Sequence, residues 1–530
     1  MANIKIDGKE LQVADGITIL EAADIAGIEI PHFCYHKELS IRGSCRMCLV
    51  EVEKMPKLVP ACSTTIKDEM NIFTSSERVI KNRRGVLEFF LINHPLDCPI
   101  CDQAGECTLQ DYVYKYGSAV SRFTEEKEHF ERRKELGPHV LHYTERCVLC
   151  GRCIRFCEEI SETRELARFN RSFRSEVDVF PGKRLDNKLS GNVVDLCPVG
   201  AMVSKEFLFK SRVWWLTHTE SICPLCSRGC NIEIDSRDNK ILRVRPRPNP
   251  EVNIQWMCDD GRFGWDFVQR EDRLTSPLKR EGAEMVSISR TQAINLVKGR
   301  LSYIISNFGK EAVAAIASPY LTNEDNYLLR ILLLSVIGSP YLAVCQPPQV
   351  EERMVFPSGF TIEADKSPNL AGAQDVSAVE GRELISHRQL LQKVASGEVR
   401  ALYFLGGAPR MSLPVEEREM LRKVDFLVVH DYAPSELTEW AELVLPNLSF
   451  AEREGTFTNF QGRVQRLRPA LLPPGEAKPD WEILQEVCQA MGGEVNYPSA
   501  EKVFEEIVGA VPGYKSLSYK DLGTQGKVKG

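Results

Sequence analysis

The sequence lacks the marks of several protein classes. Its longest apolar run, ILLLSVI at 331–337, is far shorter than the ~20 residues that a membrane span needs. The start, MANIKIDGKELQV, has neither a basic segment nor an apolar core, which predicts no secretory signal. Basic residues are not in excess, since the formal net charge is -7, and this argues against a nucleic-acid partner. We therefore expect a soluble protein without a direct membrane span.

Cysteine is scarce in the second half of the chain and abundant in the first. Of 18 cysteines in 530 residues, 16 lie before residue 260, and only Cys345 and Cys488 follow. Without an export signal, such thiols are expected to bind metal rather than to form disulfides. The length predicts about three to five domains.

The hydrophobic pattern predicts a mixture of folds. A hairpin is predicted at the N-terminus, where Asp7-Gly8 separates the segments IKID and KELQV. A short amphipathic helix is predicted next and should end near Gly27. Residues 77–93 predict a helix with a basic face, interpreted as solvated, with docking as the alternative. After about residue 272, apolar strands such as 401–407 and 425–431 alternate with helices, which favours a parallel α/β domain.

The first candidate ligand set has the spacing C-x10-C-x2-C-x13-C. Four thiolates can hold a [2Fe–2S] cluster, two on each iron. Zinc is the alternative, although zinc sites usually use two CxxC-like pairs. The set consists of Cys34, Cys45, Cys48 and Cys62.

The second set lies in HPLDCPICDQAGEC. Its three cysteines leave a [4Fe–4S] cluster one ligand short, and a histidine four residues before the first of them can supply the fourth. A neutral imidazole in place of a thiolate should raise the potential of the cluster. The set is His94, Cys98, Cys101 and Cys107.

The third set combines ERCVLCGRC with DLCPVGA, a bacterial ferredoxin pattern for a [4Fe–4S] cluster. Cys157 would ligate a second cluster, but the positions of that cluster's other ligands hold Asn187, Ser190 and Val193. We expect one cluster here, with Cys157 as a buried bystander. The ligands are Cys147, Cys150, Cys153 and Cys197.

The fourth set has the pattern C-x2-C-x3-C-x27-C and again suits a [4Fe–4S] cluster, with zinc as the alternative. It consists of Cys223, Cys226, Cys230 and Cys258. Cys157, Cys345 and Cys488 remain unassigned and are interpreted as structural.

These four sets, in this order, resemble the 75 kDa-type iron–sulfur subunit, or G subunit, of bacterial NADH:quinone oxidoreductase (respiratory complex I). The fourth set and the stretch AELVLPNLSFAEREGTFTNFQGRVQ are also similar to molybdopterin oxidoreductases. The resemblance implies a β-grasp [2Fe–2S] ferredoxin domain, a [4Fe–4S] module with one histidine and three cysteine ligands, a ferredoxin-like [4Fe–4S] module, a molybdopterin-oxidoreductase-type [4Fe–4S] domain and a shortened α/β domain. The expected boundaries are 1–78, 79–118, 119–212, 216–272 and 273–530.

The resemblance also implies a role. The chain would relay electrons from a flavin-containing NADH-oxidising subunit and its [2Fe–2S] partner toward the ferredoxin-like and quinone-arm subunits of a proton-translocating complex. The [2Fe–2S] cluster would lie beside the main path, and the protein would be cytoplasmic, peripheral on the inner membrane. About 270 residues follow Cys258, which is short for a molybdopterin enzyme, so we expect no molybdopterin and no catalytic residue.

Three other functions fit parts of the pattern. A molybdopterin formate dehydrogenase shares the N-terminal modules and would use Cys345 on molybdenum, but no histidine adjoins Cys345 in AVCQPPQVEE. An iron hydrogenase needs more cysteines after residue 260 than the chain has. A zinc or redox-sensing protein fits four cluster-like spacings poorly, although ligand identity alone does not fix the metal.

Overall fold

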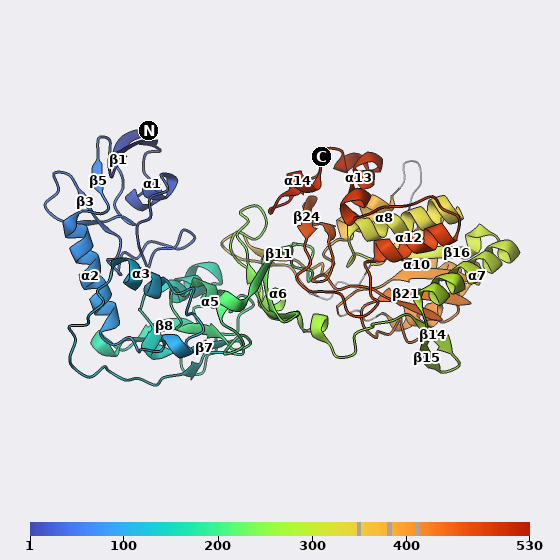
Figure 1. The fold of residues 1–530 in the computed structure, drawn as a ribbon, viewed down its shortest axis with the longest axis horizontal. Coiled ribbons are helices and arrows are strands. Elements are labelled where there is room, and N and C mark those ends of the chain that lie inside the picture. The colour runs from blue at the N-terminus through green and yellow to red at the C-terminus, as the bar shows by residue number, and fades with distance from the viewer. Residues whose placement is uncertain (347–350, 379–383, 410–412) are drawn as a thin grey trace. The chain divides into compact units, whose positions relative to one another are not determined.

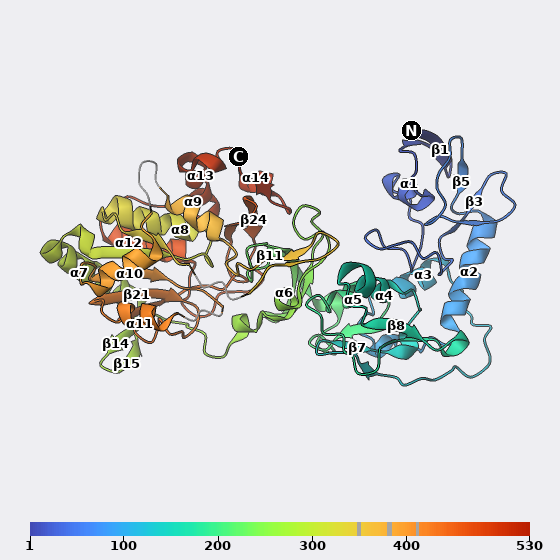
Figure 2. The same ribbon diagram turned by 180° about the vertical axis from the view of Figure 1, so that it is seen from behind.

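The computed structural model describes residues 1–346, 351–378, 384–409 and 413–530. Contacts divide the chain into two compact units, Met1–Leu216 with Phe356–Gly359, and Thr217–Val355 with Phe360–Gly530. Figures 1 and 2 show the elements of each unit from opposite sides. In the first unit, mostly small sheets and short helices surround the first three cysteine sets.

The N-terminal sheet begins with the predicted hairpin. Asp7 and Gly8 both have positive φ angles, 49° and 84°, as a tight two-residue turn requires. The sheet has the order β2-β1-β5-β3-β4, and β1 pairs antiparallel with β2 and parallel with β5. Its strands are Ala2–Ile6, Lys9–Val13, Leu49–Val52, Val59–Pro60 and Asn71–Phe73, from β1 to β5. Helix α1 (Ile19–Ile25) starts at a Thr18 capping box and is followed by Gly27 at φ 71°.

Helix α2 (Glu77–Leu91) leads into the second cysteine set, and α3 (Thr108–Tyr116) follows it. The third set begins directly before α4 (Arg152–Arg155) and closes directly after α5 (Asn192–Leu196). A π-helical turn at Phe156–Ile160 extends α4. The surrounding strands are β6 (Lys134–Glu135), β7 (Val140–His142), β8 (Leu166–Phe169), β9 (Glu176–Val179) and β10 (Met202–Ser204).

The second unit opens with an antiparallel sheet that carries the fourth cysteine set. Its strands are β11 (Thr217–Ile222), β12 (Asn231–Arg237) and β13 (Lys240–Pro246), and helix α6 (Asp259–Phe263) follows. A separate three-stranded sheet joins β23 (Gly455–Thr458), β24 (Arg463–Leu467) and β25 (Lys527–Val528), and β18 (Met354–Val355) pairs with β19 (Thr361–Ile362).

A seven-stranded sheet forms the centre of the second unit, in the order β15-β14-β22-β21-β20-β16-β17. The five strands from β22 to β17 are parallel, which confirms the predicted α/β pattern, and β14 and β15 form an antiparallel edge. The strands are Leu278–Glu281, Glu284–Ser287, Val313–Ala317, Leu342–Val344, Ala401–Leu405, Phe426–Asp431 and Leu443–Pro446, in chain order.

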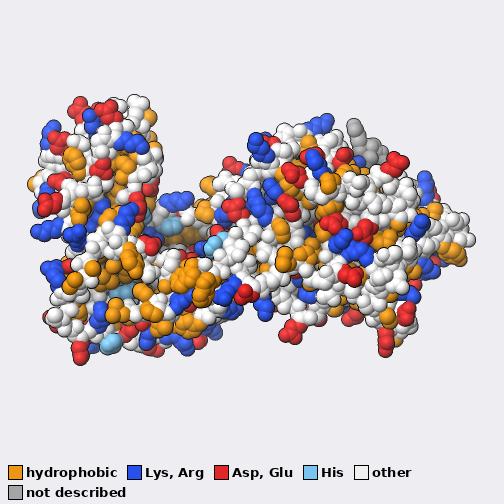
Figure 3. Space-filling view, viewed as in Figure 1, with side chains coloured by type: hydrophobic (Ala, Val, Ile, Leu, Met, Phe, Trp, Pro, Cys, Tyr) orange, Lys and Arg blue, Asp and Glu red, His pale blue; other side chains and the backbone are white. Residues whose placement is uncertain are grey.

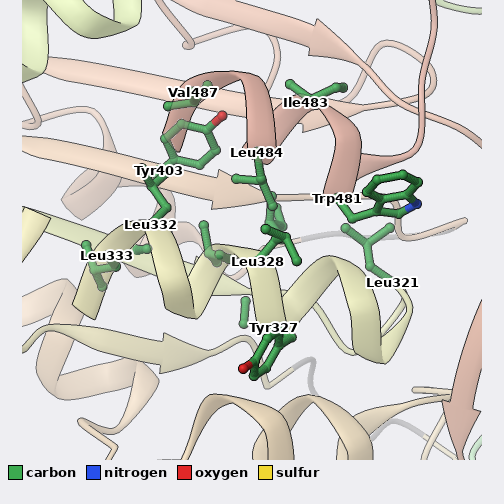
Figure 4. Packing of buried hydrophobic residues seen from close by; sticks show 14 of the residues in the cluster. Leu321, Tyr327, Leu328, Leu332, Leu333, Tyr403, Trp481, Ile483, Leu484 and Val487 are labelled. Atoms are coloured by element: carbon green, nitrogen blue, oxygen red, sulfur yellow. The ribbon is translucent and has the colours of Figure 1, made fainter. Parts of the chain in front are cut away.

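Helices cover both faces of this sheet. One face packs against α7 (Arg290–Phe308), α8 (Asn323–Arg330), α12 (Asp480–Ala490) and α13 (Ala500–Ala510), and the other against α10 (His387–Ala395) and α11 (Val415–Leu421). In Figure 4, Leu328 and Leu332 of the α8 segment lie against Leu484 of α12. Helix α8 continues as a π-helix, Ile331–Ile337. The remaining helices are α9 (Leu370–Ser377) and α14 (Tyr519–Leu522).

Candidate metal centres

The first cysteine set forms two pairs. Cys48 directly precedes β3 and Cys62 follows β4, and the pairing of these strands brings the two together, with Ala61 N–H donating to the Cys48 carbonyl at 3.0 Å. The other pair is Cys34 and Cys45. The backbone N–H of Phe33, the residue directly before Cys34, donates to the Cys45 sulfur at 3.5 Å. All four thiols are buried. This two-plus-two arrangement suits two iron atoms.

The thiols of this set also polarise one another. Hydrogen bonds from Cys45 and Cys62 hold the pKa of Cys34 far below its usual range. A hydrogen bond from Cys62 lowers the pKa of Cys48 to about 7. The same hydrogen bonds raise the pKa values of Cys45 and Cys62, so the set holds two thiols that ionise readily and two that do not.

The second set spans the loop between α2 and α3. Cys107 is the N-terminal cap residue of α3, Cys101 and Cys107 are buried, and Cys98 is exposed. Burial, together with the charges of Arg146 and Lys127, lowers the pKa of His94 to about 4. The imidazole is therefore neutral at physiological pH, as a metal ligand must be.

The third set encloses a pocket. All four cysteines line it. Its remaining wall is mainly apolar, with contributions from Val177, Val199, Ala201 and Met202. Burial raises the pKa of Cys150 to about 11 and that of Cys147 still further. Thiolates in such a site need the positive charge of a metal to be stable.

Polar side chains form a hydrogen-bonded group at Asn187, one of the positions where a second ferredoxin cluster would need cysteine. The Asn187 amide donates to the Glu165 carboxylate, which also accepts from Thr163 Oγ1 at 2.8 Å. Cys157 is fully buried in the π-helical turn, and burial raises its pKa to about 12.

The fourth set lies where β11, β12 and α6 meet. Cys223 N–H donates to the Cys230 carbonyl at 2.9 Å, and Cys258 Sγ accepts from Gly261 N–H at 3.3 Å. A Cβ at Gly261 would lie 3.1 Å from Cys223 Sγ. The close backbone approach shows why this turn of α6 carries glycine. All four thiols are buried.

Four thiol-rich ligand sets in one chain are typical of iron–sulfur proteins. A compact trio of other potential ligands lies at His218, Glu233 and Asp235, but Arg243 and Arg245 already neutralise Asp235.

The carboxyl ends of the parallel strands, where open α/β sheets bind ligands, approach the loop before α8 closely. Ser318 Oγ donates to the Gly406 carbonyl at 2.7 Å, and a Cβ at Gly407 would lie 2.8 Å from the Leu321 side chain. Cys345, the candidate molybdenum ligand, is buried among apolar residues.

Two functional features escaped the sequence analysis. Arg83 belongs to the basic segment interpreted as a solvated face, yet it is buried on the inner side of α2. The helical spacing of Val79, Arg83 and Leu87 is the signal that could have revealed it. Gly200 lies against the second set, since a Cβ there would be 2.2 Å from Cys101 Sγ, and nothing in the local sequence indicates that approach.

These sites define an iron–sulfur protein assembled from several cluster-binding modules. Five family models match it: 2Fe-2S iron-sulfur cluster binding domain (1–77), NADH-ubiquinone oxidoreductase-G iron-sulfur binding region (83–122), NADH-quinone oxidoreductase subunit 3, ferredoxin-like domain (137–203), Molybdopterin oxidoreductase Fe4S4 domain (216–270) and Molybdopterin oxidoreductase (357–490). The chain belongs to the family that contains the G subunit of NADH-quinone oxidoreductase and the 75 kDa subunit of NADH-ubiquinone oxidoreductase.

The relatives cover the chain to different extents. The 75 kDa subunit of Reclinomonas americana is 31% identical over 97% of this chain and 91% of its own length. The G subunit of Rickettsia felis NADH-quinone oxidoreductase is 42% identical over 64% of this chain. The match to that bacterial relative spans half of its length.

Two solved structures are also similar. A chain of an NAD+-reducing [NiFe]-hydrogenase has a TM-score of 0.37 and 29% identity, and covers 40% of this chain and 91% of its own. The acetylene hydratase of Pelobacter acetylenicus has a TM-score of 0.43 and 12% identity, and covers 58% of this chain and 74% of its own.

Proposed function

We propose that this chain is the electron-transfer subunit of an NADH:quinone oxidoreductase. The four ligand sets would hold one [2Fe–2S] cluster, on the Cys34 set in a β-grasp domain, and three [4Fe–4S] clusters. When bound, the clusters would each accept and release one electron at a time. The observation that carries the proposal is the presence of four thiol-rich sets in a chain that aligns along nearly its whole length with a 75 kDa subunit.

The protein's own part is to hold and shield the ligands. Backbone N–H groups point at sulfur in the first and fourth sets, and apolar side chains line the third. Such groups fix the ligand geometry, tune the potentials and keep out water. No general acid, base or nucleophile is required for this role.

Contacts in the first unit support an order of the sites that differs from the sequence order. Helix α4 carries Cys153 between two arginines, and both arginines reach the first set. Arg155 Nη2 donates to the Cys34 carbonyl at 2.5 Å, and Arg152 Nη2 donates to the Tyr35 carbonyl at 2.6 Å. The first and third sets are therefore direct neighbours.

The third set also adjoins the second. Thr108 N–H, next to Cys107, donates to the Pro198 carbonyl at 3.1 Å, next to Cys197. Gly200 lies against Cys101 Sγ in the same loop. We therefore place the Cys147 set between the Cys34 set and the His94 set. The family resemblance implied that the [2Fe–2S] cluster lies beside the main electron path. This order instead puts the [2Fe–2S] site at one end of the path.

The surface of the first unit supports membership of a complex. Large apolar side chains are exposed there, among them Leu96 (88%), Trp214 (59%) and Trp215 (57%). On the face drawn in Figure 3, apolar side chains gather in patches over this unit, whereas acidic and basic groups are interspersed. Exposed apolar patches of this kind mark interaction sites.

The partners we propose are a flavin-containing NADH-oxidising subunit with its [2Fe–2S] companion, and the ferredoxin-like and quinone-arm subunits. Among the described residues, no helix is both long and apolar enough to cross a bilayer. We propose attachment to the cytoplasmic face of the inner membrane through the complex.

Metal analysis of anaerobically purified full-length protein tests the proposal. About 14 iron atoms per chain without molybdenum agree with four clusters of the proposed types. Stoichiometric molybdenum or tungsten would favour the formate dehydrogenase alternative, and Cys345 would be the first residue to replace. Zinc in place of iron would contradict both functions.

A further inference from the structure

Helix α2 turns one arginine toward the protein interior. Its buried residues are Val79, Arg83 and Leu87, which recur at i, i+4 and i+8 and so share one face. Arg83 is only 3% exposed, whereas its neighbour Arg84 is exposed. A charged residue in the middle of an apolar stripe is rarely buried without a partner.

The guanidinium of Arg83 has no anionic partner among the described residues. Its Nε and Nη2 atoms form no hydrogen bond, and within the described ranges no carboxylate forms an ion pair with it. It does contact the face of the Tyr116 ring, whose centroid lies 5.0 Å from Cζ. An aromatic face compensates a buried charge only in part.

The first cysteine set lies near this face of α2, because Leu87, one turn after Arg83, packs in the same hydrophobic cluster as Cys34 and Cys45. Helix α2 packs against β3, whose first residue follows Cys48. Two hydrogen bonds to Glu51 of β3 fix the start of α2, from Ser76 Oγ at 2.5 Å and from Arg78 at 3.0 Å. Burial lowers the pKa of Arg83, and the negative forms of Tyr116, Asp7 and Cys48, in decreasing order, oppose this effect.

Asp7 contributes one negative charge near Arg83 but forms no ion pair with it. Its carboxylate accepts hydrogen bonds from the backbone N–H of Thr74 at 2.7 Å and from the hydroxyl of Thr74. Beside Asp7, the thiolate-ligated group on the Cys34 set supplies negative charge near Arg83. Four thiolates make such a group negative, and one added electron makes it more so.

We propose that Arg83 is the buried counter-ion of the cluster on Cys34, Cys45, Cys48 and Cys62, and that its charge raises the reduction potential of that site. This inference rests on the proposed function. A fixed positive charge attracts the reduced form more strongly than the oxidised form, and low-dielectric surroundings enlarge the difference. Arg83 is therefore a positioning and tuning residue rather than a ligand.

A redox titration of the full-length protein with reconstituted clusters tests the inference, with the EPR signal of the [2Fe–2S] cluster as readout. The variants are Arg83→Met, Arg83→Lys and the control Arg84→Met, which removes an exposed arginine from the same helix. At the wild-type midpoint, we expect Arg83→Met to lower the ratio of reduced to oxidised cluster at least tenfold, equal to about 59 mV for one electron. Arg83→Lys keeps the positive charge, so the midpoint potential of this variant should stay near that of the wild type.

A second measurement covers the case in which Arg83→Met takes up little iron. Urea unfolding of the cluster-free chains should find Arg83→Met at least as stable as wild type, because the substitution removes an unpaired buried charge. Loss of stability in the cluster-free chain would mean that Arg83 has a partner within the protein, and would overturn the inference.

The outcomes also separate this inference from the proposed function. A wild-type chain that gives no [2Fe–2S] signal contradicts the function itself. A normal signal with the same potential in Arg83→Met and Arg84→Met overturns only the role of Arg83.

Discussion

His94 differs from the fifteen cysteines of the proposed ligand sets because it is neutral when it binds. Burial lowers its pKa to about 4, so no proton competes with the metal near neutral pH. The other fifteen ligands bind as anions. The charge of the second site therefore depends on this one residue more than on any other.

Replacing His94 with cysteine should lower the potential of the second site, because a thiolate adds a negative charge that disfavours the reduced form. An EPR-monitored redox titration of the reconstituted protein measures the change. His129→Cys, at a side chain that is 81% exposed, serves as the control. An unchanged potential in His94→Cys would remove His94 from the ligand list.

Single residues also show how far sequence reasoning reaches. The cysteine spacings predict four ligand sets, and the members of the third set line one pocket. Arg83 was not predictable in this way, since a charged residue on a helix is normally solvated. The approach of Gly200 to Cys101 joins segments that lie far apart in the sequence and has no local signal.

At the scale of elements, helix α8 contains buried acidic residues that its local sequence does not reveal. Helix α8 and its π-helical continuation run from Asn323 to Ile337. Acidic residues in a first turn normally face water, yet Glu324 and Asp325 are fully buried here. Strand β23 and α14, far along the chain, supply groups that cover Glu324.

The environment of Glu324 makes its carboxyl pH-sensitive. It accepts hydrogen bonds from Thr456 N–H at 2.8 Å, Thr456 Oγ1 at 2.9 Å and Tyr519 OH at 3.0 Å. Burial outweighs these bonds and raises the pKa of Glu324 to about 7. The carboxyl of Glu324 therefore stays protonated in the folded chain up to about pH 7, whereas in the unfolded chain it ionises near pH 4.5. The free energy of unfolding should fall as pH rises from 4.5 to 7, because the unfolded chain releases a proton that the folded chain retains.

Glu324→Gln should remove that dependence. Between pH 4.5 and 8, we expect the free energy of unfolding of the variant to rise relative to wild type by roughly 3 kcal/mol, at about 1.4 kcal/mol per unit of pKa. Urea unfolding at both ends of this range measures the change, and Glu505→Gln, at an exposed carboxylate, is the control. Parallel pH profiles for Glu324→Gln and wild type would refute the assignment.

At the scale of the whole molecule, the two units rely on different sources of stability. The second unit has two large apolar clusters on the faces of its central sheet. One of the two main clusters of the first unit includes Cys34, Cys45, Cys107 and Cys150, so its core is partly built from the proposed ligands. Sequence patterns predicted the α/β character of the second unit, but the first unit has few periodic segments from which packing could be read.

Removal of the clusters should therefore affect the units unequally. Calorimetry of the chain before and after anaerobic removal of iron should find a large fall in the melting temperature of the first unit and a smaller fall for the second, which holds one set. The free energy of cluster binding contributes to the free energy of folding, so each unit loses this contribution when its clusters are removed. Reconstitution with iron and sulfide is the control. Equal shifts of both transitions would contradict this division.

The loop that follows Cys197 determines which cluster-binding modules can be transferred to another protein. Pro198 is hydrogen-bonded to the helix that Cys107 begins, and Gly200 leaves room for Cys101, so one short turn fits two sites at once. A graft that carried residues 83–122 alone into another scaffold would leave behind the backbone against which Cys101 is packed. The smallest transplantable piece is thus the second and third modules together, and an insertion in this turn should disturb both sites.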